Sequence, residues 1–478
     1  DYFNGMEDEN IVQAIPNEKA SEWMEENIPL FECPQHNFEE MYYYRWWSLR
    51  KHIKETPVGY GMTEFLVQRS YSDKYNLIAC AIGHHIYESR WLRDPKYLDQ
   101  IIHTWYRGND GGPMKKMDKF SSWNADAVLA RYMVDGDKDY LLDMKKDLET
   151  EYQRWERTNR LKNGLYWQGD VQDGMEESIS GGRRKKYARP TINSYMYGNA
   201  KALSCIGILS GDEGMAMKYG MRADTLKNLV ENELWNTRHQ FFETMRTDSS
   251  ANVREAIGYI PWYFNLPDTT QKYEIAWKEI MDEKGFSAPY GLTTAERRHP
   301  EFRTRGVGKC EWDGAIWPFA SAQTLTAMAN FMNNYPQTVL SDSVYFRQME
   351  LYVESQYHRG RPYIGEYLDE VTGYWLKGDQ ERSRYYNHST FNDLIITGLI
   401  GLRPRLDNTI EVNPLIPADK WDWFCLDNVL YHGHNLTILW DKNGDRYHCG
   451  KGLRIFVDGK EVGQANTLTK IVCENALK

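Results

Sequence analysis

The chain has 478 residues, 41% of them hydrophobic, enough to bury one large core and to carry a smaller appendage. Its formal net charge of −10 argues against nucleic acid or an anionic membrane as partner. No apolar run is long enough to span a bilayer, and the seven scattered cysteines include no Cys-x-x-Cys pair, which argues against zinc ribbons and redox motifs. The start at Asp1 favours a processed N-terminus, and with it a periplasmic or secreted location.

Residues 1–37 are polar and contain three prolines, so we expect an arm that packs on the following domain, with a short helix near 19–27. Helical periodicity then dominates from residue 38 to 402. The twelve helical patterns lie near 38–54, 73–91, 95–106, 121–135, 138–160, 190–209, 212–233, 253–264, 268–284, 313–334, 340–358 and 389–401. Twelve helices without strands between them predict a mainly α fold, an (α/α)6 toroid of six hairpins whose inner helices line the axis.

The second helical pattern contains His84, His85 and, one turn later, Glu88. Two histidines and a carboxylate can bind a metal, but no further ligand follows at a matched spacing. We therefore predict no metal site, and we expect the protein to need no cofactor and to act as a monomer.

Three stretches combine carboxyl groups with large rings, namely Gly164–Asn199, Glu311–Pro318 and Gly365–Gly373. Sugar rings present C–H faces that pack on aromatic rings and hydroxyl groups that need polar partners. Hydrolysis of a glycosidic bond also needs two separated carboxyl groups, one protonated and one ionised. An aromatic content of 14% fits a carbohydrate cleft.

The positions of these stretches predict that they meet. Residues 164–189, 296–313 and 359–388 follow the fifth, ninth and eleventh helical patterns. In an up-and-down barrel, connections that follow odd-numbered helices emerge at the same end. Carboxyl groups far apart in sequence should therefore line one open mouth.

Past residue 403 the periodicity changes to alternation. Residues 409–412, 435–440 and 453–457 read as strands, and Asp458-Gly459 is a hairpin turn signal. We expect residues 403–478 to form a small β-rich cap.

These motifs carry a family resemblance. Residues 174–178 resemble the Ser-Gly-x-Asp-x-Ser segment that holds the general acid in trehalases, processing α-glucosidases and mannosylglycerate hydrolases, all six-hairpin barrels. Residues 311–318 are similar to their sugar-binding Trp-Asp and Trp-Pro segment, and residues 365–373 to their Glu-x-Tyr-Asp-Pro-x-Thr-Gly segment, whose glutamate is the general base. The match covers most of residues 38–402 in family order. Two departures are Glu176, where the family has aspartate, and Asp173, where it usually has serine.

The resemblance implies a glycoside hydrolase that is exo-acting and inverting, with an oligosaccharide or polysaccharide as substrate. It assigns Glu366 as general base and Glu176 as general acid, and Asp173 and Glu177 compete for the acid role. Expected substrate contacts come from Trp123, Arg189, Asn193, Trp312, Asp313, Trp317, Tyr367 and His388.

Three other functions use similar helical barrels or surfaces. A polysaccharide lyase would take its base and acid from residues 386–388, and a sugar epimerase would use histidines such as His84, His85 and His388. A non-catalytic carbohydrate-binding protein would keep the rings but lose a carboxyl group, whereas both acid positions are filled here.

Overall fold

The computed structural model describes residues 2–269 and 272–477. The first residue of the predicted arm, the last residue of the predicted cap, and residues 270 and 271 of the predicted helix 268–284 lie outside this described part.

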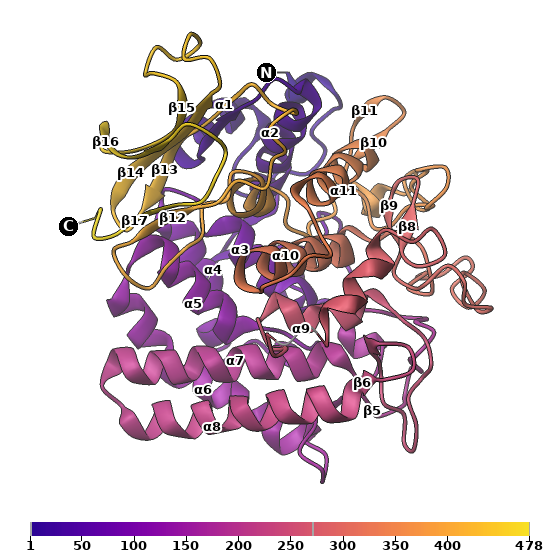
Figure 1. The fold of residues 1–478 in the computed structure, drawn as a ribbon. Coiled ribbons are helices and arrows are strands. Elements are labelled where there is room, and N and C mark those ends of the chain that lie inside the picture. The colour runs from indigo at the N-terminus through magenta and orange to yellow at the C-terminus, as the bar shows by residue number, and fades with distance from the viewer. Residues whose placement is uncertain (1, 270–271, 478) are drawn as a thin grey trace.

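Twelve helical segments of the described residues form an inner and an outer ring (Figure 1). The outer segments are α2 (His36–Arg50), α4 (Pro95–Arg107), α6 (Lys138–Asn159), α8 (Glu213–Leu229), the 3-10 helix Glu274–Ile280 and α11 (Asp342–Ser355). The inner segments are α3 (Ile82–Ser89), α5 (Asn124–Asp135), α7 (Pro190–Ser210), α9 (Ile260–Tyr263), α10 (Pro318–Asn334) and α12 (Asn392–Leu394). Each inner helix contacts the next, and α12 contacts α3, so the inner ring closes. The predicted (α/α)6 toroid is confirmed.

The helix ends carry ordinary capping signals. Asp94, Asp137 and Asp212 accept hydrogen bonds from main-chain N–H groups in the first turns of α4, α6 and α8. Gly136 and Gly211 end α5 and α7 in the left-handed conformation. Because these signals are local, the predicted bounds of these helices are close to the observed ones.

Several inner segments are shorter than predicted. The helix predicted over 73–91 is α-helical only from Ile82 to Ser89, because Tyr75 and Asn76 have left-handed φ angles of 63° and 65° that break the pattern. The segment predicted over 389–401 is α12 followed by a π-helical turn, Ile395–Leu399. The residues that were predicted to be helical but lie outside these helices lengthen the connections at one end of the barrel.

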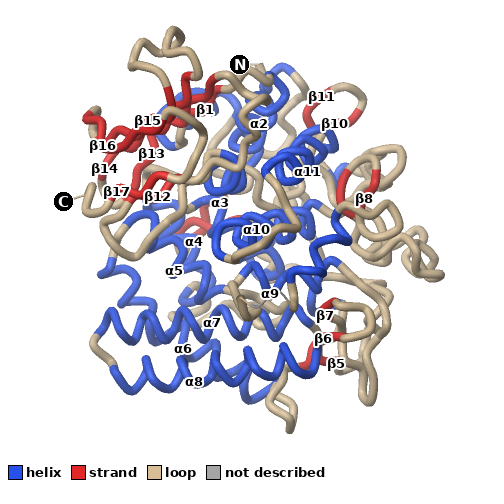
Figure 2. The backbone as a smooth tube through the Cα atoms, viewed as in Figure 1, coloured by secondary structure: helices blue, strands red, loops and turns tan. Residues whose placement is uncertain are grey.

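The two ends of the barrel differ in the length of their connections. Outer helices lead into inner ones through 51–81, 108–123, 160–189, 230–259, 281–317 and 356–391, whereas inner-to-outer links are as short as 136–137 and 211–212. Five of the long connections carry a small hairpin: β2 (Ile53–Thr56) with β3 (Gly59–Met62), β4 (Trp167–Gln168) with β5 (Tyr187–Ala188), β6 (Trp235–Asn236) with β7 (Phe241–Phe242), β8 (Ser287–Ala288) with β9 (Gly291–Leu292), and β10 (Tyr357–His358) with β11 (Arg361–Pro362). Figure 2 shows loops gathered on the right of the view, beside β5–β8. This loop-rich end is the mouth.

A five-stranded antiparallel sheet follows the barrel, in the order β1-β13-β14-β15-β16. Its strands are β1 (Leu30–Glu32), β13 (Trp423–Tyr431), β14 (His434–Asp441), β15 (Gly452–Val457) and β16 (Lys460–Ala465), and β12 (Ile410–Val412) pairs separately with β17 (Ile471–Cys473). The strands predicted at 409–412, 435–440 and 453–457 are present, and Asp458-Gly459 turns β15 into β16 with both φ angles positive. The N-terminal arm joins this sheet through β1, after helix α1 (Ala20–Asn27).

The sheet packs on the end of the barrel opposite the mouth. The main-chain N–H of His432 donates to the carbonyl of Val134 near the end of α5. Arg93, between α3 and α4, donates to the carbonyl of Asn428 and to the side chain of Asn435. The cap therefore supports the short connections and leaves the mouth open.

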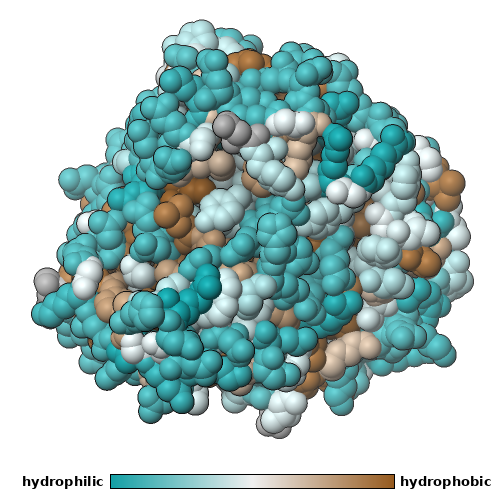
Figure 3. Space-filling view, turned by 90° about the horizontal axis from the view of Figure 1, so that it is seen from above, coloured by the Kyte–Doolittle hydropathy of each residue, from teal (hydrophilic) through white to brown (hydrophobic). Residues whose placement is uncertain are grey.

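Seen from above, the molecule is mostly hydrophilic, with hydrophobic residues in small patches (Figure 3). Within the described residues, no helix combines the length and the apolar character needed to cross a membrane.

Candidate active site

The predicted acid segment lies on the connection between α6 and α7. Residues 171–173 form a 3-10 turn, and Gly174 closes it with a φ of +73°. A Cβ on Gly174 would lie 2.3 Å from the Sγ of Cys80, so only glycine lets this segment approach the start of α3. The turn thus brings the segment that carries Glu176 close to the start of α3.

Asp173 fixes this segment through buried polar contacts. Its buried carboxylate forms an ion pair with Arg189 at 2.5 Å and accepts hydrogen bonds from the hydroxyl groups of Ser121, at 2.8 Å, and Thr191. Asn193 also holds the segment, because its side chain exchanges hydrogen bonds with the main chain of Tyr166. Arg189 and Asn193, predicted as substrate contacts, are therefore both engaged in internal bonds.

Glu176 is half-buried and has no ion pair within the described part of the chain. Burial raises its pKa to about 7, and the negative charges of Glu366 and Asp170 add to the effect. The neighbouring Glu177 has a left-handed φ of 65° and pairs instead with Arg183 at 2.8 Å. Glu176 thus has the raised pKa that a proton donor at neutral pH requires, whereas Asp173 and Glu177 are both ion-paired.

Glu366, on the connection between α11 and α12, lies in a different environment. One carboxylate oxygen, Oε2, is 3.0 Å from Arg382 and 3.3 Å from Lys377, while Oε1 is 4.0 Å from the thiol of Cys310. Burial raises the pKa of Cys310 to about 12, helped by the charges of Glu176 and Glu366. The charges of both glutamates thus act on Cys310, but among the described residues only Glu366 is paired with cations.

The base segment is bound to the predicted sugar-binding segment. Ile316 and Leu368 exchange two main-chain hydrogen bonds, of 3.0 and 2.9 Å. Arg303 forms ion pairs with Glu311 on one segment and with Asp369 and Glu370 on the other. Two stretches about 50 residues apart in sequence therefore form one wall of the mouth.

Three predicted aromatic residues form a stack on this wall. The rings of Trp312 and Trp317 lie 4.4 Å apart, and that of Tyr367 lies 4.6 Å from Trp317. All three are buried, and the indole N–H of Trp317 donates to the carbonyl of Glu311. The indole nitrogen of Trp312 has no partner among the described residues.

A second aromatic cluster closes the axis behind the carboxyl groups. The ring of Phe319 is in contact with those of His84, at 4.5 Å, His388, at 5.8 Å, Trp312 and Trp123. Every ring nitrogen of these four heterocycles lacks a partner within residues 2–269 and 272–477. Burial lowers the pKa values of both histidines well below the usual range, so they remain neutral. Buried polar groups without partners are uncommon, and here they gather in one place.

The two carboxylate oxygens of Asp313 differ in their hydrogen bonding within the described residues. Its Oδ2 accepts hydrogen bonds from the main-chain N–H groups of Arg305 and Gly306, which shapes the preceding turn. Its buried Oδ1 has no partner in the part of the chain that the structure describes.

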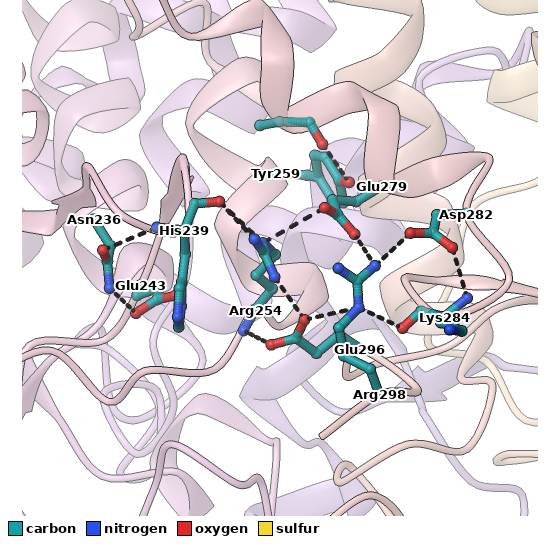
Figure 4. A network of polar contacts seen from close by, with 11 residues as sticks. Asn236, His239, Glu243, Arg254, Tyr259, Glu279, Asp282, Lys284, Glu296 and Arg298 are labelled. Carbon is teal, nitrogen blue, oxygen red and sulfur yellow. Dashed lines mark hydrogen bonds and ion pairs between the residues drawn. The ribbon is translucent and has the colours of Figure 1, made fainter. Parts of the chain in front are cut away.

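Ion pairs hold the neighbouring connections in place (Figure 4). Arg254 lies between Glu296, at 2.7 Å, and Glu279, at 3.7 Å, and Arg298 joins the same carboxyl groups. The next residue, Glu255, accepts hydrogen bonds from the main-chain N–H groups of residues 179 and 180. The acid segment is thereby attached to a rigid network.

The sequence analysis missed Glu64, on the connection between α2 and α3, as well as the cations Lys377 and Arg382. Glu64 is bonded to Tyr386, whose ring lies 4.0 Å from that of His388, and Arg382 lies 6.0 Å from the ring of the neighbouring Phe65. The charges of Glu366 and Glu176 both help to raise the pKa of Glu64. The position of Glu64 in the chain could have indicated it. Residues 55–72 follow the first predicted helix, and connections after odd-numbered helices open at the mouth.

A cavity of about 660 Å³ lies apart from this cluster, between residues 6–7, α2 and residues 358–385. Its carboxyl groups are those of Glu7, which pairs with Arg384, and Asp379, whose pKa is lowered chiefly by the hydrogen bond from Tyr374. Neither Glu176 nor Glu366 lines this cavity. No cluster of three or more metal-binding side chains is found in the described residues.

A closed (α/α) barrel with carboxyl groups at its mouth suits a glycoside hydrolase, and the family assignment decides for that class. The chain belongs to the mannosylglycerate hydrolase MGH1-like glycoside hydrolase domain family, whose model matches residues 74–389. The C-terminal domain model of glycosyl hydrolase family 65 matches residues 402–463.

Solved structures agree with this fold. A structure named "Sialidase" is 95% identical with a TM-score of 0.99; it covers 99% of this chain, whereas this chain spans 44% of its length. The GH63 mannosylglycerate hydrolase from Thermus thermophilus in complex with glucose is 12% identical over 74% of this chain and 99% of its own, with a TM-score of 0.56. The GH78 family rhamnosidase of Bacillus sp. GL1 is 9% identical over 90% of this chain and 41% of its own, with a TM-score of 0.61.

Proposed function

We propose that the protein is an exo-acting, inverting glycoside hydrolase in which Glu176 is the general acid and Glu366 the general base. The observation that carries this proposal is the contrast between the two carboxyl groups. Glu176 has a pKa raised to about 7 and no cation paired to it in the described chain, while Arg382 and Lys377 balance the charge of Glu366.

In this reaction Glu366 takes a proton from a water molecule while the oxygen of that water attacks the anomeric carbon. Glu176 gives its proton to the leaving glycosidic oxygen, so one C–O bond forms while another breaks. Inversion requires carboxyl groups about 6.5–9.5 Å apart, with space for that water. The two residues come from connections on different hairpins, which favours a wide separation.

The terminal sugar would rest against the aromatic clusters. The buried rings of Trp312, Trp317 and Tyr367 pack on one another and support this wall of the mouth. Atoms without a partner in the described residues, such as Oδ1 of Asp313 and the ring nitrogens of His388, can bond hydroxyl groups. Because the buried rings of Phe319 and its neighbours fill the axis, the mouth has a closed floor. A closed floor admits only the end of a glycan, which supports exo action.

The charges favour a neutral sugar. Glu64, Glu176 and Glu366 lie together, and the cations nearest to them, Arg382 and Lys377, already contact Glu366. A sugar carboxylate would find both of these cations already paired with Glu366, whereas a neutral sugar needs no cation. The name of one similar structure suggests sialoside hydrolysis, which is therefore our second candidate. It ranks second also because that name belongs to a chain more than twice as long, of which this chain matches only a part.

The test is incubation with 4-nitrophenyl glycosides covering both anomers of common neutral sugars, plus a sialoside and a uronate polysaccharide. We expect free sugar from one neutral glycoside, released first as the inverted anomer in a proton NMR time course. Retention of configuration would refute the inverting mechanism, and release of sialic acid alone would support the second candidate. An unsaturated product that absorbs ultraviolet light would indicate a lyase, and rearrangement without cleavage an epimerase.

A further inference from the structure

Glu64 is a buried carboxyl group at the mouth that the proposed mechanism leaves unused. It lies on the connection between α2 and α3 with a side chain 5% exposed. Its carbonyl accepts a hydrogen bond from the N–H of Asn387, whose side chain donates to the carbonyl of Thr63. Two connections that both open at the mouth are thus joined beside this carboxyl group.

The two oxygens of Glu64 have different environments. Oε1 accepts a 2.7 Å hydrogen bond from the hydroxyl group of Tyr386. Oε2 is buried and has no partner in the described residues. A buried carboxyl oxygen without a partner costs free energy, so such an atom is expected to meet one during function.

Glu64 lies beside residues of the candidate active site. The ring of Tyr386 lies 4.0 Å from that of His388, which belongs to the cluster around Phe319. Burial raises the pKa of Glu64 to about 8, and the charges of Glu366 and Glu176 add to this effect against the hydrogen bond from Tyr386. At neutral pH the group therefore keeps its proton, and Oε2–H can act as a donor.

We propose that Glu64 is a third carboxyl group of the active site, which binds a hydroxyl group of the terminal neutral sugar through Oε2 while Tyr386 holds Oε1. This inference rests on the proposed function but assigns Glu64 no part in proton transfer. It acts by positioning the sugar, and by the same contact it selects sugars that carry that hydroxyl group.

A structural tyrosine–carboxyl pair elsewhere provides the control. The hydroxyl group of Tyr87 donates to Asp126 at 2.6 Å, and burial raises the pKa of Asp126 to about 6. Its charged neighbour is Arg90, and neither Glu176 nor Glu366 contributes to that shift. Asp126→Asn therefore perturbs a similar pair outside the active site and should leave kcat/KM unchanged.

The experiment compares Glu64→Gln and Glu64→Met, which are similar in size and differ in hydrogen bonding. We measure kcat/KM for the cleaved 4-nitrophenyl glycoside and for its monodeoxy analogues. Glu64→Gln keeps a donor and should stay within a few-fold of wild type, while Glu64→Met should lose roughly 10- to 100-fold. The loss should disappear for the one deoxy analogue that lacks the bound hydroxyl group.

Equal losses on every analogue, or no loss at all, would refute the inference. If Glu64→Met does not fold, Tyr386→Phe tests the same contact, because it releases Oε1 and should give a weaker loss with the same dependence on one hydroxyl group. Should wild type cleave no glycoside, the catalytic proposal fails by itself. Calorimetric binding of the same glycosides to the wild-type and Glu64→Met proteins then still decides whether Glu64 contacts sugar.

Discussion

The division of roles between Glu176 and Glu366 can be tested by changing the leaving group. Glu176→Gln removes the proton donor, and Glu366→Gln removes the base that activates water. Loss of either general catalyst should lower kcat by roughly two to four orders of magnitude on an ordinary glycoside. A 2,4-dinitrophenyl leaving group departs without protonation, so it should restore most of the rate of Glu176→Gln and little of that of Glu366→Gln.

The pH dependence follows from the environment of Glu176. The active form carries the proton, and its pKa of about 7 should place the alkaline limb of kcat/KM near that pH, with a tenfold fall per further unit. The charges that face it are those of Glu366 and Asp170, which raise its pKa, and of Arg183, which lowers it. Replacing Glu366 by Gln removes a negative neighbour, so the residual limb should move to lower pH.

These outcomes are measured as kcat and kcat/KM from pH 4 to 10 with two aryl glycosides of different leaving-group acidity. Glu177→Gln is the matched control, since Glu177 pairs with Arg183 on the same segment and should keep the wild-type alkaline limb. If Glu176→Gln is impaired equally on both substrates and the limb persists in it, the proton donor is another group.

The remaining predictions concern the supports of the site. Asp173→Asn leaves Arg189 buried without its partner and should cost about 3–5 kcal/mol, seen as a lower melting temperature, whereas a fully stable variant would contradict the anchoring role. Gly174→Ala should lower both stability and activity because its Cβ meets the thiol of Cys80; a Cys80→Ala background should relieve part of this loss. Folded Glu64 keeps its proton to a pH of about 8 against an ordinary pKa of 4.5, so wild type loses stability as pH rises through this window. Glu64→Gln lacks this loss, and its melting temperature relative to wild type should be higher at pH 9 than at pH 5.

Much of the fold could be predicted from the sequence because its signals are local. Periodicity and capping residues such as Asp137 define the long helices, and the odd-numbered connections correctly indicated the mouth. The short inner helices were overpredicted because apolar residues at the axis continue into the mouth loops, where the same side chains are buried without helical backbone. Tyr75 shows this, with a left-handed φ inside an otherwise helical pattern.

Side-chain partners could not be predicted in the same way. The sequence offers Asp173, Glu176 and Glu177 within five residues, and nothing local says that Asp173 will pair with Arg189. The same holds for Glu64, whose significance depends on Tyr386, more than 300 residues away. Such assignments require the folded arrangement of the six long connections.

The placement of cations explains how two glutamates at one mouth can hold opposite protonation states. The base connection supplies both Arg382 and Lys377 within 3.3 Å of its own Glu366, so the charge of the base is balanced by residues close to it in sequence. The acid connection supplies Arg183 as well, but that side chain pairs with Glu177 and leaves Glu176 to burial and to the charge of Glu366. A negative charge on Glu366 raises the pKa of Glu176, and Arg382 and Lys377 are in contact with that charge. A cation next to Glu176 instead of Glu366 would lower the pKa of the proposed acid and leave the charge of the proposed base without its partner. The proposed mechanism therefore needs different ion-pair partners on the two connections.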